Sequence, residues 1–337
     1  MAKWYKDSGF QSDIVMSTRV RFARNIRGIA FPNKMSSDDA KKVIALTEQA
    51  LDGMNYNFKR IDLNGLTASE KQKLVEKRYI SPNLAKQTKP CAVFISDDES
   101  VSIMVNEEDH IRLQSIFAGL ECQKAYDIIS KIDAFMADKL SYAVHPKYGY
   151  LTSCLTNVGT GMRISFMLHL PAVCRCSVAD SLFAALGKIG VTVRGMYGEG
   201  TKASGYIFQI SNQTTLGVDE KEITDKLYDV VNQIITKERE LRTLLVKQRG
   251  IAMEDKIMRS CGILKNARLL SGKEMLSLFS EVRFGISAGI VKDIDIRTLN
   301  SLMIETSPAH LAAENENAGE RDAQRARMVR ESLNKEE

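Results

Sequence analysis

The chain has 337 residues, 44% of them hydrophobic and 26% charged, which is the composition of an ordinary globular protein with room for two domains. No apolar run reaches transmembrane length and the first residues lack a signal-peptide core, so we expect a cytoplasmic protein whose six cysteines are reduced thiols. The net charge of +5 suits anionic ligands but does not by itself indicate nucleic acid, and the cysteine spacing predicts no metal site.

The first informative stretch is S-T-R-V-R-F-A-R-N, residues 17–25. In an extended chain Arg19 and Arg21 share one face, opposite to their apolar neighbours. Two adjacent guanidinium groups repel each other, and an anion between them would relieve that repulsion. The pattern also suits an exposed basic edge strand, which uses charge to discourage pairing. Residues 36–51 then form a predicted helix with a serine cap.

Residues 92–95 and 101–105 are predicted strands on either side of a polar turn. The second strand leads into N-E-E-D-H-I-R, where Asn106 is a good helix N-cap and the acids that follow suit a first helical turn. That helix explains the acids but not Arg112. At helical spacing Glu108 and Arg112 are neighbours. A carboxylate beside a phosphate-binding arginine could hold an acceptor near a phosphoryl donor.

Residues 122–144 carry the apolar stripe of a long helix, and the stretch that follows combines two patterns. N-V-G-T-G, residues 157–161, is a glycine-containing turn that a ligand can approach closely. Residues 163–170 alternate as in a half-buried strand, which would aim Arg163 at the mouth of a loop beside Cys154. This arrangement suits a phosphorylated ligand, and an edge strand with a solvent-exposed arginine fits it equally.

Two more strands are predicted at residues 191–194 and 206–211, with Arg194 on the polar face of the first. The connection between them contains four glycines and is expected to be a mobile lid. Glu199 lies in this connection between two glycines, so the backbone would place its carboxylate. The alternative is a long exposed hairpin loop with an incidental glutamate.

Helices are predicted around these strands. Ser177 and Asp180 resemble a capping box at the start of one, and residues 219–248 have the pattern of one long helix. Beyond this helix the strand signals fade and short helices follow. We therefore expect a catalytic domain over residues 1–250 and a helical domain over residues 251–337.

The C-terminal residues 321–330 are predicted to form a basic helix. Arg321 and Arg325 would lie one turn apart and could bind one anion together. A solvated charged helix fits the same pattern. DNA binding through this helix has no support beyond its charge.

Four stretches together resemble signatures of the ATP:guanidino phosphotransferases, the phosphagen kinase family, in the family's order. They are S-T-R-V-R, N-E-E-D-H-I-R, C-L-T-N-V-G-T-G-M-R and R-G-M-Y-G-E. The match is highly specific and covers roughly residues 12–245. Within the family the chain most resembles the bacterial protein-arginine kinases, because the N-terminal helical domain of the small-molecule enzymes is absent and the C-terminal part is helical. R-D-x-x-R-A at residues 321–326 is similar to a motif that binds phosphoarginine as an allosteric site in those kinases.

The resemblance implies ATP and Mg²⁺ as cofactors and a role for each site residue. Glu108 and Glu199 would hold the acceptor guanidinium group, with Cys154 beside it. Phosphoarginine would bind at Arg321, Asp322 and Arg325. The ATP phosphates would be held by Arg19, Arg21, Arg112, Arg163 and Arg194.

The resemblance also implies an α+β fold, with an antiparallel sheet flanked by helices and a small all-helical C-terminal domain for dimerisation and regulation. The implied activity is transfer of the γ-phosphoryl group of ATP to arginine side chains of proteins, marking them for Clp-dependent degradation in the stress response. The implied partners are protein substrates, a zinc-containing activator, a heat-shock repressor, the Clp protease machinery and a second copy of the chain. Neither a membrane nor direct nucleic-acid binding is expected.

Two positions depart from the family pattern. Leu155 stands where proline usually follows the family's cysteine, and Met167 stands where the small-molecule enzymes commonly have a histidine near the adenine. Two alternatives remain open: a kinase of a small guanidino compound, and a catalytically silent adaptor that binds phosphoarginine.

Overall fold

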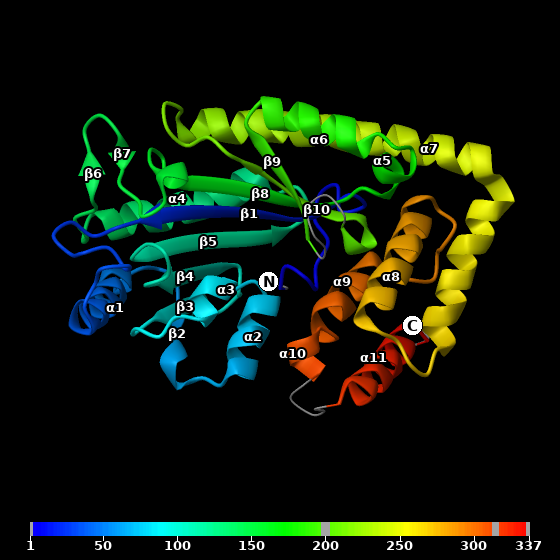
Figure 1. Cartoon of the computed structure of the whole chain (residues 1–337), viewed down its shortest axis with the longest axis horizontal. Coiled ribbons are helices and arrows are strands. Elements are labelled where there is room, and N and C mark those ends of the chain that lie inside the picture. Colours follow the sequence, from blue (N-terminus) through cyan, green and yellow to red (C-terminus); the bar gives the residue numbers. More distant parts are fainter. Residues whose placement is uncertain (1–2, 197–202, 312–316, 335–337) are drawn as a thin grey trace.

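The computed structural model describes residues 3–196, 203–311 and 317–334. Its centre is an eight-stranded sheet in the order β2-β3-β4-β5-β1-β8-β10-β9, in which all neighbouring strands are antiparallel (Figure 1). The strands are β1 Val15–Arg24, β2 Phe58–Asp62, β3 Ala92–Ser96, β4 Val101–Val105, β5 Ile111–Ala118, β8 Met162–His169, β9 Val191–Gly195 and β10 Ile207–Asn212. The predicted α+β fold with an antiparallel sheet is confirmed.

Long helices cover one face of this sheet. Helix α4 (Cys122–Ala137) packs on β1 and β5, and the first half of α7 (Glu220–Asn266) packs on β8 and β10. Their apolar stripes are buried against the strands, which leaves the arginine-bearing side of the central strands free of this helical layer. Helices α1 (Ser37–Leu51) and α6 (Ala179–Lys188) extend the layer, and Ser36 caps α1 as the sequence predicted.

The C-terminal part is helical, as predicted, and α7 leads directly into it. Helices α8 (Gly272–Ser287), α9 (Ile296–Glu305), α10 (Pro308–Leu311) and α11 (Ala318–Leu333) lie at one end of the sheet (Figure 1). The predicted end of this helix near residue 248 is confirmed by a break in α7. Two helical segments meet at Gly250, whose φ of 43° and ψ of −120° are not helical, and the second segment continues to Asn266.

The remaining elements are short. Helices α2 (Ala68–Glu76) and α3 (Pro82–Ala85) lie near β2 and β3, and α5 (Pro171–Arg175) follows β8. Strands β6 (Val144–His145) and β7 (Gly149–Tyr150) form a separate hairpin. The 3-10 turns within the described ranges are η1 Leu63–Gly65, η2 Leu155–Asn157 and η3 Ser204–Tyr206.

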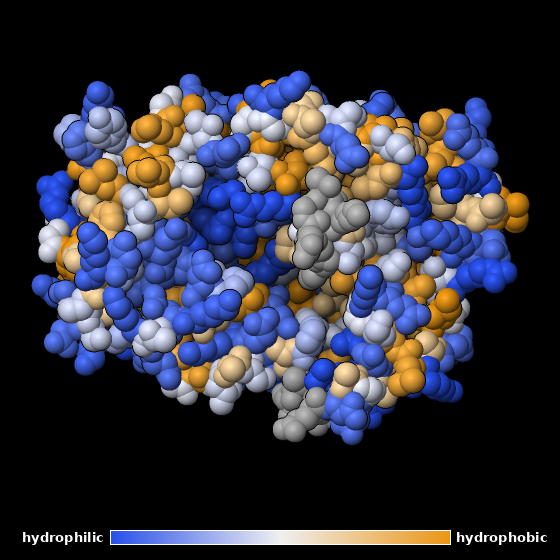
Figure 2. All heavy atoms as spheres, viewed as in Figure 1, coloured by the Kyte–Doolittle hydropathy of each residue, from blue (hydrophilic) through white to orange (hydrophobic). Residues whose placement is uncertain are grey.

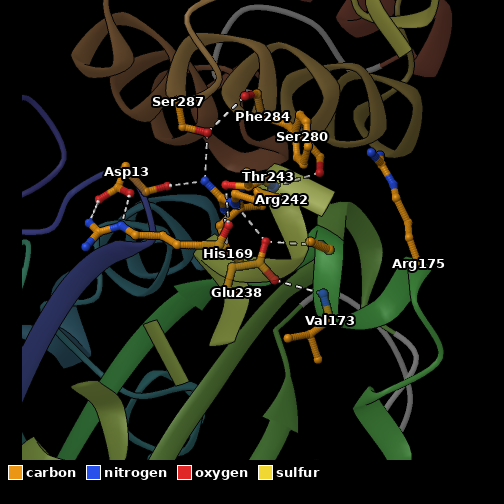
Figure 3. A network of polar contacts seen from close by, with 12 residues as sticks. Asp13, His169, Val173, Arg175, Glu238, Arg242, Thr243, Ser280, Phe284 and Ser287 are labelled. Atoms are coloured by element: carbon orange, nitrogen blue, oxygen red, sulfur yellow. Dashed lines mark hydrogen bonds and ion pairs between the residues drawn. The ribbon is translucent and has the colours of Figure 1, made fainter. Parts of the chain in front are cut away.

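A buried polar network joins the sheet to the C-terminal helices (Figure 3). His169, at the end of β8, contacts the Ser280 hydroxyl on α8 through Nε2 at 2.7 Å. Arg242 on α7 donates to the His169 carbonyl at 3.0 Å and to the Ser287 hydroxyl at 2.7 Å. Glu238 accepts from Arg242 and from two backbone amides of α5. Because its members satisfy one another, this network fixes α8 against the end of β8.

Three local predictions were wrong. Residues 106–110 form a sharp turn between β4 and β5 instead of a helix start, with Asn106 at φ 63°. Ser177 has φ 57° and does not cap α6, which begins without a side-chain cap. Strand β8 is buried on both faces, because the helical layer covers one and the C-terminal part covers the far end of the other. No helix in the described ranges is long and apolar enough to cross a membrane.

Candidate active site

One cavity of about 280 Å³ gathers most of the site residues predicted from the sequence. It lies on the face of the central strands opposite the long helices, where Figure 2 shows a strongly hydrophilic hollow. Of the predicted catalytic and phosphate-binding residues, its lining contains Glu108, Cys154, Arg19, Arg21, Arg112, Arg163 and Arg194. Glu199 lies outside the described residues.

Strand register explains how five arginines from distant parts of the sequence meet. On β1, Arg21 lies opposite Arg163 of β8, and Ala23 lies opposite Arg112 of β5. On β10, Gln209 lies opposite Arg194 of β9. Because side chains alternate along a strand, these positions share one face of the sheet. The apolar neighbours of Arg21 are packed into the core below.

The arginines repel one another and have few partners within the protein. Burial lowers the pKa of Arg19, Arg21 and Arg163, and the surrounding guanidinium groups lower it further. The Nε atoms of Arg21 and Arg163 are buried without a hydrogen-bond acceptor. Cationic groups held together with unused donors form an anion site, and three or more converging arginines suit a polyphosphate.

Weak polar contacts orient these arginines, and sequence reasoning missed them. Arg19 contacts the Ser165 hydroxyl at 3.3 Å and the Gln209 amide oxygen at 3.4 Å. Arg163 donates to the Ser211 hydroxyl at 3.2 Å. A serine or glutamine on a strand gives no signal of this role without the register of its neighbours.

The turn between β4 and β5 presents two adjacent glutamates in different ways. Glu107 is 5% exposed and forms an ion pair with Arg112 at 2.7 Å. It also accepts from the Ser81 hydroxyl at 2.6 Å and the Glu108 amide at 2.8 Å. The Glu108 side chain is 41% exposed, lines the cavity and lies 3.1 Å from Arg112. The predicted proximity of Glu108 and Arg112 therefore holds, but the turn produces it and a helix does not.

The remaining polar residues of N-E-E-D-H form buried hydrogen bonds that fix the backbone around the site. Asp109 is fully buried and accepts from the Asn25 amide and the Ser153 backbone amide, both at 2.7 Å. His110 accepts from the Ile26 amide at 3.0 Å. The Ser153 bond connects the turn to the segment that carries Cys154, and the other two connect it to the residues after β1. Within this motif only Glu108 faces the cavity.

Cys154 is partly exposed, and its Sγ lies 3.0 Å from the Thr156 hydroxyl. The glycines after it are required by packing as well as by ligand access. Gly159 has φ 115°, and a Cβ there would lie 2.1 Å from the Thr215 carbonyl oxygen. Gly161 has φ 63° and lies against Arg24, which is buried in an ion pair with Asp133 at 2.7 Å. This arginine is therefore structural.

A second cavity of about 880 Å³ adjoins the first and shares Arg19, Arg21 and Gln209 with it. Its other walls come from α2 and the residues after it, including Arg78, and from α8, α9 and α10. Together the two cavities have a charged end among the arginines and a less polar end between the sheet and the C-terminal helices.

The predicted C-terminal motif lies on α11, away from the arginine cavity. Arg321 and Asp322 are partly buried, whereas Arg325 is 3% exposed. Arg325 donates to the carbonyl oxygens of Leu270 at 2.8 Å and Thr306 at 3.1 Å, and it forms an ion pair with Asp322. In this arrangement its guanidinium group joins the start of α8 to the end of α9.

Comparison with known proteins identifies the same family along the whole chain. Residues 40–241 match the model of the ATP:guanido phosphotransferase C-terminal catalytic domain, and residues 250–337 match the model of the protein-arginine kinase McsB C-terminal domain. The protein-arginine kinase of Geobacillus stearothermophilus is 44% identical, over 100% of this chain and 94% of its own length. That of Moorella thermoacetica is 45% identical, over 98% of this chain and 97% of its own.

Solved structures show the same fold at lower identity. Lombricine kinase is 23% identical with a TM-score of 0.62, covering 70% of this chain and 69% of its own. The duplicated taurocyamine kinase of Schistosoma mansoni is 20% identical with a TM-score of 0.62, covering 81% of this chain and 40% of its own. With both family models and full-length relatives in agreement, the chain belongs to the ATP:guanido phosphotransferase family and, within it, to the protein-arginine kinases.

Proposed function

We propose that this chain transfers the γ-phosphoryl group of ATP to the guanidinium group of arginine side chains in proteins. The observation that carries the proposal is the single cavity in which five arginines meet a partly exposed carboxylate and a thiol. The full-length similarity to protein-arginine kinases supports proteins as the substrate.

The five cavity arginines are proposed to bind the ATP phosphates. Phosphoryl transfer depends mainly on positioning the reactants and on stabilising charge at the transferring group. The unused donors of Arg21 and Arg163 would acquire phosphate acceptors, and the repulsion within the cluster would be relieved. The nucleoside is proposed to lie in the adjoining 880 Å³ cavity.

Mg²⁺ is proposed to arrive with ATP as part of the substrate. Among the described residues, no three His, Cys, Asp or Glu side chains gather as a metal site. The buried Glu107 is already bound to Arg112. The donors present therefore fit a metal held mainly by phosphate oxygens, where it would neutralise charge on the phosphates.

Glu108 is proposed to bind the acceptor guanidinium group together with Glu199. A guanidinium group is protonated at neutral pH and must lose a proton before a nitrogen can attack phosphorus. A carboxylate can pair with the guanidinium group and accept that proton. Only one Glu108 oxygen contacts Arg112, so the other is placed to receive the acceptor. Cys154 would lie beside this acceptor.

The wider role is proposed from family membership. Phosphorylated proteins would pass to the Clp protease machinery in the cytoplasmic stress response, with a zinc-containing activator and a heat-shock repressor as further partners. Residues 1–250 would form the catalytic domain, and residues 251–337 the part that supports a homodimer and binds phosphoarginine through Arg321, Asp322 and Arg325. The buried position of Arg325 favours a supporting role for it in such a site.

Phosphate transfer from Mg-ATP tests the proposal directly. The pure protein is incubated with free arginine, with an unfolded protein, and with the same protein after arginine-to-lysine replacement. We expect acid-labile phosphate on the arginine-containing protein alone. Phosphate on free arginine would indicate a small-molecule kinase. ATP binding without transfer to any acceptor, with and without candidate activators, would indicate a silent adaptor.

A further inference from the structure

Leu155 is the most exposed large hydrophobic residue in the described part of the chain, with 86% of its surface accessible. It lies in η2 between Cys154 and Thr156, both of which line the arginine cavity. The leucine itself does not line the cavity. Its side chain therefore projects into solvent at the rim of the proposed acceptor site.

The backbone around Leu155 is held on both sides. The Thr152 hydroxyl donates to the Cys154 carbonyl at 2.7 Å. The Thr215 hydroxyl donates to the carbonyl oxygens of Thr156 at 2.9 Å and Val158 at 2.8 Å. A side chain fixed by such bonds loses little further backbone freedom when it binds a partner.

The same contacts bring a second exposed leucine to this rim. Thr215 is followed by Leu216, which is 50% exposed. A Cβ built on Gly159 would lie 2.8 Å from the Cα of Leu216, so the two segments are in direct contact. Figure 2 shows apolar atoms gathered beside the hydrophilic hollow, over the hairpin β6–β7 and the residues before α7.

A single exposed leucine is ordinary on a protein surface, so only its position relative to the cavity can indicate a function. The 280 Å³ cavity has room for a guanidinium group and its stem, but the polypeptide on either side of a substrate arginine must lie outside it. Each residue of an extended chain spans at most about 3.6 Å, so side chains one or two positions from the arginine reach only the rim. Leu155 occupies part of that rim, and Leu216 follows Thr215, which is bonded to the lining residue Thr156.

Resting on the proposed function, we propose that Leu155 and Leu216 form a docking surface for an apolar side chain next to the target arginine of a protein substrate. The occupant is the substrate polypeptide itself, because the surface is continuous with the cavity that would hold its arginine. Such a surface selects arginines in apolar sequence, which folded proteins bury and unfolded proteins expose.

Kinetics with paired peptides test the proposal. One peptide carries leucine on both sides of its only arginine, and the other carries glycine. We expect wild-type enzyme to have a KM about five- to tenfold lower for the leucine peptide, as burial of one leucine on a rigid surface would give. Leu155→Ser is expected to remove most of this preference and Leu216→Ser part of it. Ile251→Ser, at a position 79% exposed on the far half of α7, is the matched control and is expected to keep it.

An equal preference in the wild type and in both leucine variants would overturn the docking surface. Direct binding of the labelled leucine peptide, followed by fluorescence anisotropy, separates this result from failure of the proposed function. If no peptide is phosphorylated, the proposed function fails. The docking surface then stands only if Leu155→Ser weakens peptide binding and Ile251→Ser does not.

Discussion

Replacing the buried Glu107 with glutamine is expected to destabilise the protein far more than the same change at its exposed neighbour Glu108. Glutamine keeps an acceptor for the Ser81 hydroxyl but turns an amide donor towards Arg112. Breaking a buried ion pair costs about 3–5 kcal/mol, and Arg112 keeps one partner, so we expect a loss of about 3 kcal/mol. Glu108→Gln removes an exposed pair and is expected to cost less than about 1 kcal/mol.

The effects on catalysis are expected in the opposite order. Glu108→Gln removes the proposed proton acceptor and should lower kcat by about 10²- to 10⁴-fold, with a smaller change in KM for ATP. Glu107→Gln acts through Arg112 and should lower kcat/KM by about tenfold to a hundredfold.

Urea unfolding and steady-state kinetics measure both effects on the same preparations. The chain has one tryptophan, and Trp4 is 4% exposed, so its fluorescence reports unfolding. Equal unfolding free energies for the two variants would contradict the structural role of Glu107. Unchanged turnover in Glu108→Gln would refute its proposed role in proton transfer.

Three further predictions concern buried charges. Asp133→Asn, which breaks the ion pair with Arg24, is expected to lower the unfolding free energy by about 3 kcal/mol in urea titrations, and a change below about 1 kcal/mol would contradict it. Burial and neighbouring arginines lower the pKa of His169 well below 6.5. As the pH falls, His169 is therefore protonated in the unfolded chain at a higher pH than in the folded chain. Stability is therefore expected to fall as pH drops below about 6.5, by up to about 1.4 kcal/mol per pH unit, and His169→Gln should remove that share of the slope. Arg325→Lys cannot reproduce the two-carbonyl contact and is expected to cost about 2–3 kcal/mol in the same assay, whereas a urea-unfolding curve identical to that of the wild type would refute the bridging role.

Structural features that follow from a periodic or local residue pattern could be predicted from the sequence. Alternation along β1 placed Arg19 and Arg21 on one face, and the structure has both lining the arginine cavity. The serine cap of α1 was equally local, because the serine side chain bonds a backbone amide three residues away. Such features depend only on residues that are close together in the sequence.

Turns with left-handed backbone conformation could not be predicted from such local patterns. Asn106 and Ser177 are good capping residues, yet both have positive φ and neither starts a helix. Polar residues with short side chains tolerate that conformation, so the same letters fit a cap or a turn. Glu108 was singled out correctly, but on a helical spacing that the structure does not have. The turn that presents it depends on Ser81 and Asn25, which are far away in the chain.

Most buried hydrophobic side chains of the two matched family segments belong to one continuous core, and a smaller separate cluster lies around Leu63 and Val93. A single cluster extends from Trp4 to Leu333 and includes residues of β8, both halves of α7, α8 and α11, and the polar network around His169 crosses the same boundary. We therefore expect the two matched segments to unfold together. The chain should melt in one cooperative calorimetric transition, and a fragment ending at residue 250 should expose the His169 end of the sheet and aggregate.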